Sequence, residues 1–156
     1  MPLVKSEAVI EAPLQELWEL AQGVEKMPEF MPDLVAVKIL EDEQLSPTKR
    51  RTVSDWTARI KQFNRNVHWV EEDIWDSETY ACTFEQTKGD YNVYRGEWKF
   101  VSVEGTNHTQ ALLEIEYAIE IPLLGALIQK VVKKLMQENC DMMLRCLKAE
   151  AEKGQV

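Results

Sequence analysis

The chain of 156 residues lacks several features that mark specialised classes of protein. It has no apolar run approaching the roughly 18 residues that a membrane-spanning helix needs. Its first residues, MPLVKSEAVIEAP, include three charged side chains, which the apolar region of a secretory signal peptide would not tolerate. We therefore expect neither integral membrane association nor secretion.

Cysteine and histidine are also scarce. The three cysteines, Cys82, Cys140 and Cys146, are an odd number without metal-ligand spacing, which is typical of buried thiols in a reducing compartment. The two histidines, His68 and His108, have no cysteine or second histidine at ligand spacing. We expect no metal site, no cofactor and a cytoplasmic location.

Positive charge is in short supply, with 18 Lys and Arg residues against 27 Asp and Glu residues and a net charge of −9. This balance argues against a nucleic-acid partner. We interpret the basic run 49–51 as a solvated strand start rather than a phosphate-binding or partner-binding patch. No G-x-S-x-G, Walker or G-x-G-x-x-G pattern occurs, so the sequence predicts neither a nucleophile elbow nor a nucleotide-binding loop.

What the chain has instead is a succession of segments with a period of two, as in strands whose side chains alternate between two faces. In YNVYRGEWKF, Tyr94, Trp98 and Phe100 share one face, and the charged residues share the other. The same period predicts strands in segments 3–11, 34–43, 48–60, 79–87 and 110–121. The register of segment 64–75 is ambiguous. Short turn-like connections predict antiparallel pairing, and an acidic cluster at 41–43 is expected to end its strand.

Two short helical segments are expected after the first strand. Pro13 opens an amphipathic helix, because proline is tolerated in the first turn, where its missing donor costs nothing. The apolar residues of this helix recur at i, i+3, i+4 and i+7: Leu14, Leu17, Trp18 and Ala21. The next segment, VEKMPEFMPDL, contains two prolines and can hold at most one helical turn and a bend.

The strongest pattern is a 3.6-residue period from Pro122 to about Ala151, which predicts one long helix. A helix of about 25 residues is about 37 Å long, comparable to a ten-residue strand. Asn139 projects near the centre of its apolar arc, where an amide needs a partner. That partner is either a polar group of the sheet or a ligand, unless Asn139 lies at the rim. The arc contains Leu124, Ile128, Val131, Val132, Leu135, Met136, Met142, Met143 and Cys146.

The order of these elements predicts an α+β fold in one domain spanning residues 1–156. A twisted sheet with one apolar face must bury that face, and the C-terminal helix is the only element long enough to cover it. We expect a curved antiparallel sheet of about seven strands wrapped around the long C-terminal helix, with two short helices after the first strand.

This order, together with local sequence, resembles the START-like superfamily, also called helix-grip or SRPBCC. The resemblance covers essentially the whole chain and rests on VIEAPLQELWELAQGVEKMPEFMPDL, NVHWVEEDIWD, FEQTKGDYNVYRGEWKF and IPLLGALIQKVV. Within the superfamily the chain is most similar to bacterial polyketide cyclase/dehydrase proteins, and next to coenzyme Q-binding proteins. The resemblance implies a helix-grip fold and a cavity between sheet and helix that holds lipids, sterols, quinones or polyketides.

Inward-facing aromatic residues are consistent with such a cavity. One helix about 10 Å across cannot fill the concave side of the sheet. Tyr and Trp rings have polar tips that suit a ligand pocket with a few orienting groups, although they could also pack a core with their tips bonded to the backbone. The candidate ligand-binding residues are Trp56, Tyr80, Phe84, Gln86, Tyr94, Trp98, Leu113, Tyr117, Leu135 and Asn139.

The acidic cluster Glu71, Glu72 and Asp73 has two interpretations. At least one member shares the inward face by parity, and a carboxyl group in an apolar pocket would have a raised pKa suited to acid–base chemistry. We favour the commoner arrangement, in which a strand end or bulge turns the acids to water. Catalytic residues are therefore unknown.

The expected function is binding of a hydrophobic small molecule of polyketide, lipid or quinone type. Two roles remain open: a polyketide cyclase or dehydratase, and a non-catalytic quinone or lipid carrier. An enzyme needs a polar group aimed at the reacting carbon, whereas a carrier needs only shape and an apolar lining. The oligomeric state is either monomer or dimer.

Overall fold

The computed structural model describes residues 2–120 and 127–155, apart from the side chain of residue 127. Its seven strands form one antiparallel sheet in the order β1-β7-β6-β5-β4-β3-β2. The strands are β1 (Leu3–Ile10), β2 (Leu34–Gln44), β3 (Lys49–Ile60), β4 (Arg65–Asp76), β5 (Ala81–Gly89), β6 (Val93–Ser102) and β7 (Thr109–Ala118). The helices are α1 (Leu14–Gln22), the 3-10 helices η1 (Val24–Glu29) and η2 (Lys61–Phe63), and α2 (Leu127–Lys153). The expected helix-grip α+β fold is confirmed.

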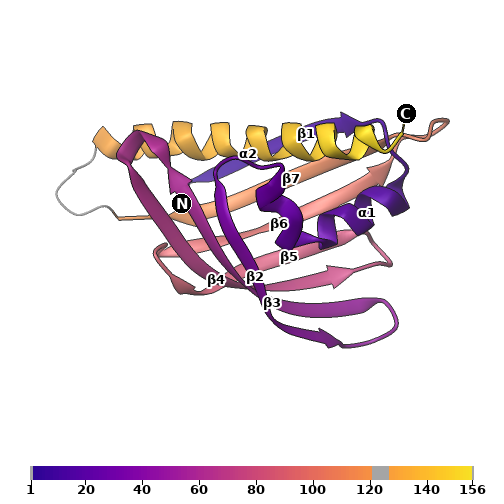
Figure 1. Cartoon of the computed structure of the whole chain (residues 1–156), viewed down its shortest axis with the longest axis horizontal. Helices are drawn as coiled ribbons and strands as arrows, with labels where there is room; N and C mark the ends of the chain where they lie inside the picture. Colours follow the sequence, from indigo (N-terminus) through magenta and orange to yellow (C-terminus); the bar gives the residue numbers. More distant parts are fainter. Residues whose placement is uncertain (1, 121–126, 156) are drawn as a thin grey trace.

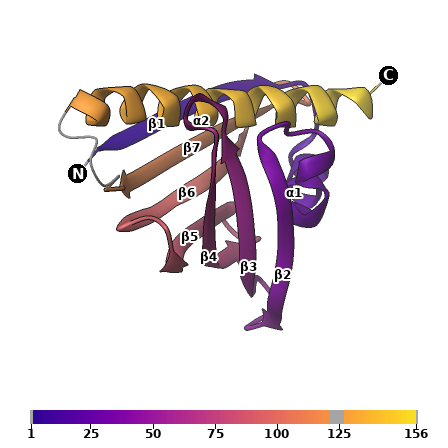
Figure 2. The same ribbon diagram turned by 60° about the vertical axis from the view of Figure 1, so that its left-hand side comes forward.

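The sheet is continuous from β2 through β7, where each strand pairs with the next along the chain. Only the first strand departs from this meander, because β1 pairs with β7 at the far edge. The chain therefore crosses from one edge of the sheet to the other through α1 and η1 before β2 begins. Figures 1 and 2 show α1 on the same side of the curved sheet as α2, beneath its C-terminal part.

Helix α2 packs mainly along β1, with fewer contacts to β7, and does not lie over the middle of the sheet (Figure 2). Polar contacts fix it there: Ser6 on β1 donates to Asp141 (2.6 Å), and Gln137 donates to the carbonyl of Lys5 (2.7 Å). Lys148 reaches the carbonyl of Val9 at 3.0 Å. Because the helix sits over one edge of the sheet, the concave faces of β3, β4 and β5 are left for other groups to cover.

This position changes which residues of the helix are buried. The buried stripe is Val132, Met136, Cys140, Leu144, Leu147 and Ala151. The arc predicted from the sequence omitted Cys140, Leu144 and Leu147, and it included Val131, which is 45 % exposed. The reason is that contact with β1 sets the rotation of the helix, and the 3.6-residue period leaves that rotation open within a broad apolar arc. Leu124 and the expected start at Pro122 lie outside the described residues.

Two further expectations differ from the structure. The segment after α1 holds a six-residue 3-10 helix, about two turns rather than at most one, because a 3-10 turn takes only three residues. The acidic run 41–43 does not end β2, which continues to Gln44. Its side chains stay in the sheet because basic residues at the start of β3 neutralise them: Asp42 pairs with Arg50 at 2.7 Å, and Arg51 lies 3.8 Å from both Glu41 and Glu43.

Helix α1 covers one end of the concave face. Trp18 is 3 % exposed, and its ring makes edge-on contacts with Trp75, Tyr80 and Phe100 at centroid distances of 5.6, 5.4 and 6.0 Å. These rings form a packed aromatic cluster at the α1 end, which leaves the remaining open volume between η1, α2 and strands β3 to β7.

Candidate functional site

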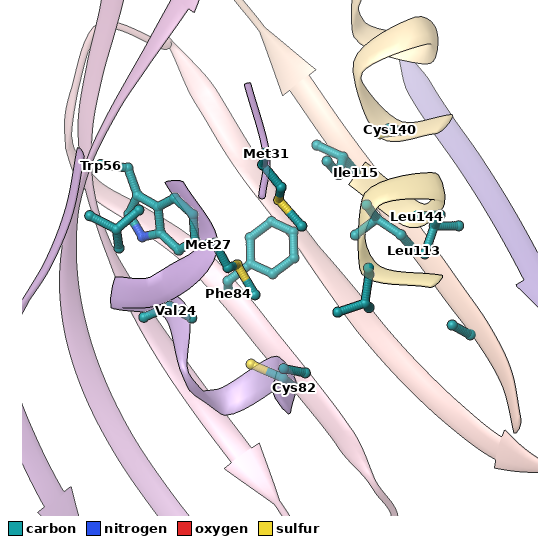
Figure 3. Packing of buried hydrophobic residues seen from close by; sticks show 14 of the residues in the cluster. Val24, Met27, Met31, Trp56, Cys82, Phe84, Leu113, Ile115, Cys140 and Leu144 are labelled. Carbon is teal, nitrogen blue, oxygen red and sulfur yellow. The ribbon is translucent and has the colours of Figure 1, made fainter. Parts of the chain in front are cut away.

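A cavity of about 310 Å³ lies between the concave face of the sheet, η1 and α2. Most of its lining is apolar, and every strand from β3 to β7 contributes. In the view of Figure 3 the side chain of Met27 lies between Trp56 and Phe84, and the side chain of Met31 extends toward the Phe84 ring. Met27 and Met31 are 4 % and 0 % exposed, so the segment around η1 covers the part of the sheet that α2 does not reach.

Seven of the ten residues predicted from the sequence line this cavity. They are Trp56, Phe84, Tyr94, Trp98, Leu113, Leu135 and Asn139. The first five come from four strands and share the concave face, as the period of two predicts for each strand separately. The last two project from α2 on the flank away from β1.

The other three predicted residues lie elsewhere. Tyr80 precedes β5, in a turn with φ of 54°, and its hydroxyl donates to Gln15 at 3.1 Å. Gln86 bonds the backbone N–H and carbonyl of Tyr91 at 3.2 and 2.8 Å and so joins β5 to the segment before β6. Tyr117 is 1 % exposed on β7 but does not line the cavity. Hydrogen bonds to Gln15 of α1 and to the backbone of Tyr91 hold Tyr80 and Gln86, respectively, away from the open volume.

Two acidic residues of the lining, Glu71 and Asp73 on β4, are not among the ligand-binding residues predicted from the sequence. They are only 5 % and 3 % exposed, so the interpretation that the cluster faces water is wrong for both. Strand β4 continues to Asp76, and residues 69, 71, 73 and 75 therefore keep one parity. Only Glu72 faces outward, where it accepts a hydrogen bond from Arg51 at 2.8 Å.

A hydrogen-bonded network holds the Asp73 carboxylate in place. Its Oδ2 accepts hydrogen bonds from the hydroxyls of Ser54 (2.7 Å) and Thr52 (3.0 Å) on the adjacent strand β3. Each hydroxyl in turn accepts an indole N–H, Ser54 from Trp56 at 2.7 Å and Thr52 from Trp75 at 3.1 Å. Each of the two indole N–H groups thus donates to a hydroxyl group, and both hydroxyl groups donate to the same carboxylate oxygen. This arrangement favours the ionised form of Asp73.

Glu71 has a poorer set of partners. Its Oε2 accepts one long hydrogen bond, from the indole of Trp69 at 3.3 Å. Burial, and then the charge of Asp73, raise the pKa of Glu71 well above its usual range. Burial also raises the pKa of Asp73, to about 6, although its bonds to Ser54 and Thr52 oppose this rise. Simultaneous ionisation of the two carboxyl groups is therefore disfavoured, and Asp73, which accepts the better hydrogen bonds, is the member whose charged form is stabilised.

The thiol and phenol groups of the lining stay neutral. Burial raises the pKa of the Cys82 thiol well above its ordinary value, so Cys82 is not a thiolate nucleophile at neutral pH. Burial likewise raises the pKa of Tyr91 and Tyr94. Trp69 stacks on Trp56 at a centroid distance of 5.9 Å and contacts both tyrosines, which surrounds the Glu71 carboxyl group with rings.

The exposed residues of the lining mark where the cavity opens. They include Arg59 and Gln62 near η2 and Glu138 and Arg145 on α2. The charged groups buried at the opposite, sheet side are the carboxyl groups of β4. The site is thus an apolar, aromatic chamber with an acidic pair at depth and a mixed-charge rim.

Two further findings bear on the class of protein. In residues 2–120 and 127–155, no cluster of three or more His, Cys, Asp or Glu side chains is arranged to hold a metal ion. Within the same ranges no helix combines the length and the apolar character needed to span a membrane.

Comparison with known proteins identifies the family. The model of the family described as polyketide cyclase/dehydrase and lipid transport matches residues 10–143. The chain belongs to this family. Among curated protein sequences none matches the chain.

Solved structures with the same fold cover almost the whole chain. TTHA0849 from Thermus thermophilus is 30 % identical, with a TM-score of 0.89 over 99 % of this chain and 100 % of that one. The Zhui aromatase/cyclase from a Streptomyces species is 16 % identical, with a TM-score of 0.82 over 97 % and 94 % of the two chains. A START superfamily protein from Mycobacterium smegmatis is 15 % identical, with a TM-score of 0.78 over 97 % of both. All three share the fold of this chain over nearly its whole length.

Proposed function

We propose that this protein binds a hydrophobic small molecule of polyketide, lipid or quinone type in the cavity between the sheet and α2, in the cytoplasm. The observation that carries the proposal is the cavity itself, about 310 Å³ in volume and lined by residues such as Trp56, Phe84, Tyr94 and Leu113. Ligand pockets are typically about 300 Å³ or larger, mostly apolar, with a few polar groups that orient the ligand. The acidic pair and Asn139 supply such groups here.

Native mass spectrometry of freshly purified protein, followed by solvent extraction, tests whether a ligand is present. We expect a mass increment that extraction removes and that an Ala58→Trp variant lacks. Ala58 lines the cavity, so a large ring there should displace the ligand. Ala36→Trp on the adjacent strand β2 is the matched control, because Ala36 is exposed and outside the lining. Failure of the purified protein to carry or take up any apolar molecule would contradict the proposal.

A second candidate function, catalysis as a polyketide cyclase or dehydratase, is favoured by the buried pair Glu71 and Asp73. A neutral acid beside an ionised carboxylate provides a proton donor and a proton acceptor in one apolar site. In a dehydration, Asp73 would take the proton from the carbon next to a ketone. Glu71 would give its proton to the departing hydroxyl group, which leaves as water. Transfer of the proton from Asp73 to Glu71 would restore the pair.

Elimination of water from 4-hydroxy-4-phenylbutan-2-one, followed by the absorbance of its conjugated product, tests this second function. We expect turnover that falls about 100-fold or more in Asp73→Asn and in Glu71→Gln, since a general acid or base contributes about 10²–10⁴-fold. Glu72→Gln, on the outer face of the same strand, should keep full activity. No turnover, with binding intact, would leave the non-catalytic quinone or lipid carrier as the function.

A further inference from the structure

The depth of the cavity carries negative charge without a buried positive charge to balance it. Of the described residues that line it, none is lysine or histidine, and the two arginines, Arg59 and Arg145, are exposed. Glu71 and Asp73 are the charged residues at the buried side. A buried ion is costly unless it is paired, so this charge shapes what can enter.

The neighbouring cations do not neutralise the pair, because each already has a closer acidic partner. Arg50, on β3, donates two hydrogen bonds to Asp42, at 2.9 and 2.7 Å. Arg51 donates to Glu72 on the outer face of the sheet. Glu72, on the outer face of β4, adds a like charge that raises the pKa of Asp73.

The hydrogen bonds to Asp73 occupy only one of its two carboxylate oxygens. Those from Ser54 and Thr52 both reach Oδ2, which leaves Oδ1 as the carboxylate oxygen available for Glu71 or for a ligand. Two carboxyl groups that hold a single proton can donate only one hydrogen bond but can accept several. A ligand group that donates a hydrogen bond therefore fits the pair better than one that only accepts.

We propose that Glu71 and Asp73 select ligands by charge, so that the cavity takes apolar molecules with a hydroxyl or ammonium donor and excludes carboxylates such as fatty-acid anions. This inference rests on the proposed ligand-binding function and narrows its substrate class. A ligand with its anionic group at the depth of the cavity would place that group beside the Asp73 carboxylate, with no cation between them. A ligand bound in the opposite orientation would place its hydrocarbon part against the charge of Asp73. Both placements are unfavourable in a site of low dielectric.

A matched series of naphthalenes tests the inference by isothermal titration at pH about 8, where Asp73 is ionised. The ligands are 2-naphthol, 2-naphthylmethylamine, 2-methoxynaphthalene and 2-naphthoate, which share one ring system and differ in donor capacity and charge. We expect the first two to bind at least about tenfold more tightly than 2-methoxynaphthalene, and 2-naphthoate at least about tenfold more weakly.

Two variants and a change of pH assign the effect to the pair. Asp73→Asn should remove the discrimination against 2-naphthoate, whereas Glu85→Gln, at an exposed position of β5, should leave it unchanged. If Asp73→Asn fails to fold, the unmodified protein gives the same information at pH about 5.5, where Asp73 is largely protonated and 2-naphthoate is still an anion. Cys82, Tyr91 and Tyr94, which face the pair from β5, β6 and the segment between them, have raised pKa values and do not titrate in this range.

The outcomes separate this inference from the function on which it rests. Binding of 2-methoxynaphthalene with equal binding of 2-naphthoate would overturn the charge selection and leave the ligand-binding function standing. Charge selection would also be overturned, and ligand binding would stand, if Asp73→Asn still discriminated against 2-naphthoate as strongly as the unmodified protein does. Absence of binding for all four ligands would overturn both proposals. Weak binding of 2-naphthoate that recovers in Asp73→Asn or at lower pH would support the inference.

Discussion

Ser54 donates its hydroxyl hydrogen to Oδ2 of Asp73 across 2.7 Å, between neighbouring strands in the buried face of the sheet. The same hydroxyl accepts the indole N–H of Trp56, so one serine links a cavity-lining ring to a buried carboxylate. Since Ser54 pairs with Glu71 in the β3–β4 register, the serine, the ring and both acids belong to one small region of the cavity wall.

Replacement of Ser54 by alanine should raise the pKa of Asp73. It removes one of two hydrogen bonds that stabilise the charged form, and a hydrogen bond to a charged group contributes about 1.5–3 kcal/mol, equivalent to about one pKa unit or more. A carbon-13 NMR titration of the Asp73 carboxyl group measures the change. Ser77→Ala, which removes an exposed hydroxyl bonded to the carbonyl of Thr48, is the control. An unshifted pKa in Ser54→Ala would show that the network does not tune Asp73.

The stability of the protein should rise as pH falls from about 7.5 to about 5. The pKa of Asp73 is raised from 3.8 to about 6 in the fold, so folding disfavours its ionised form and stability is lost as pH rises through this interval. We expect Asp73 to add about 1–2 kcal/mol to the free energy of unfolding at pH about 5.

Urea denaturation across this pH range measures the effect. The double variant Glu71→Gln/Asp73→Asn should show a flatter pH profile than the unmodified protein. Asp42, Glu116 and Glu152, whose pKa values are lowered, act with the opposite sign but only at lower pH, below the ordinary glutamate range. An equal slope in the two proteins would contradict the raised pKa of the pair.

Trp98→Ala should weaken ligand binding more than it weakens the fold. Trp98 lines the cavity and is only partly buried, so its loss should cost less than the roughly 3–5 kcal/mol expected for a core aromatic residue. Phe100 stacks on Trp98 from the same strand, is 2 % exposed and lies outside the lining, which makes Phe100→Ala a matched control. Parallel urea denaturation and 2-naphthol titration of both variants distinguish a loss of stability from a loss of binding. Near-normal binding by a strongly destabilised Trp98→Ala would exclude a role in the pocket.

Asn139→Leu should preserve stability and change ligand preference. Asn139 lines the cavity, and its side chain has no hydrogen bond to any described residue, so leucine leaves no partner unsatisfied. Affinity for 2-naphthol should fall, while affinity for naphthalene should be unchanged or higher. Titration with both ligands, together with a thermal melt, decides the role. Equal losses for the two ligands would end the case for Asn139 as a ligand partner.

Gly96→Ala should destabilise the protein. A Cβ at this position would lie 2.0 Å from the carbonyl oxygen of Glu114 on β7 and 2.8 Å from the ring of Phe84, a lining residue. Strand β6 would have to shift in the middle of the sheet, at a cost of about 1–3 kcal/mol or more. Gly154→Ala, where the nearest atom is 3.6 Å away, should be close to neutral. Equal melting temperatures for the two variants would contradict the close packing at Gly96.

The sequence by itself was sufficient for the type and order of the elements and for the fold. A period of two and a period of 3.6 arise from backbone geometry within one segment, so they can be read without knowing any partner. The same local rule placed Trp56, Phe84, Tyr94 and Trp98 on one face, and the structure brings all four to the cavity. No long-range information was needed for these residues.

Only the tertiary structure decided the burial of Glu71 and Asp73 and the rotation of α2. Parity shows that residues 71 and 73 share a face, but a carboxyl group stays buried only if partners from another strand solvate it, here Ser54 and Thr52 of β3. The rotation of α2 likewise depends on polar contacts with β1, such as that between Ser6 and Asp141. These contacts join residues far apart in the chain, and no local period encodes them.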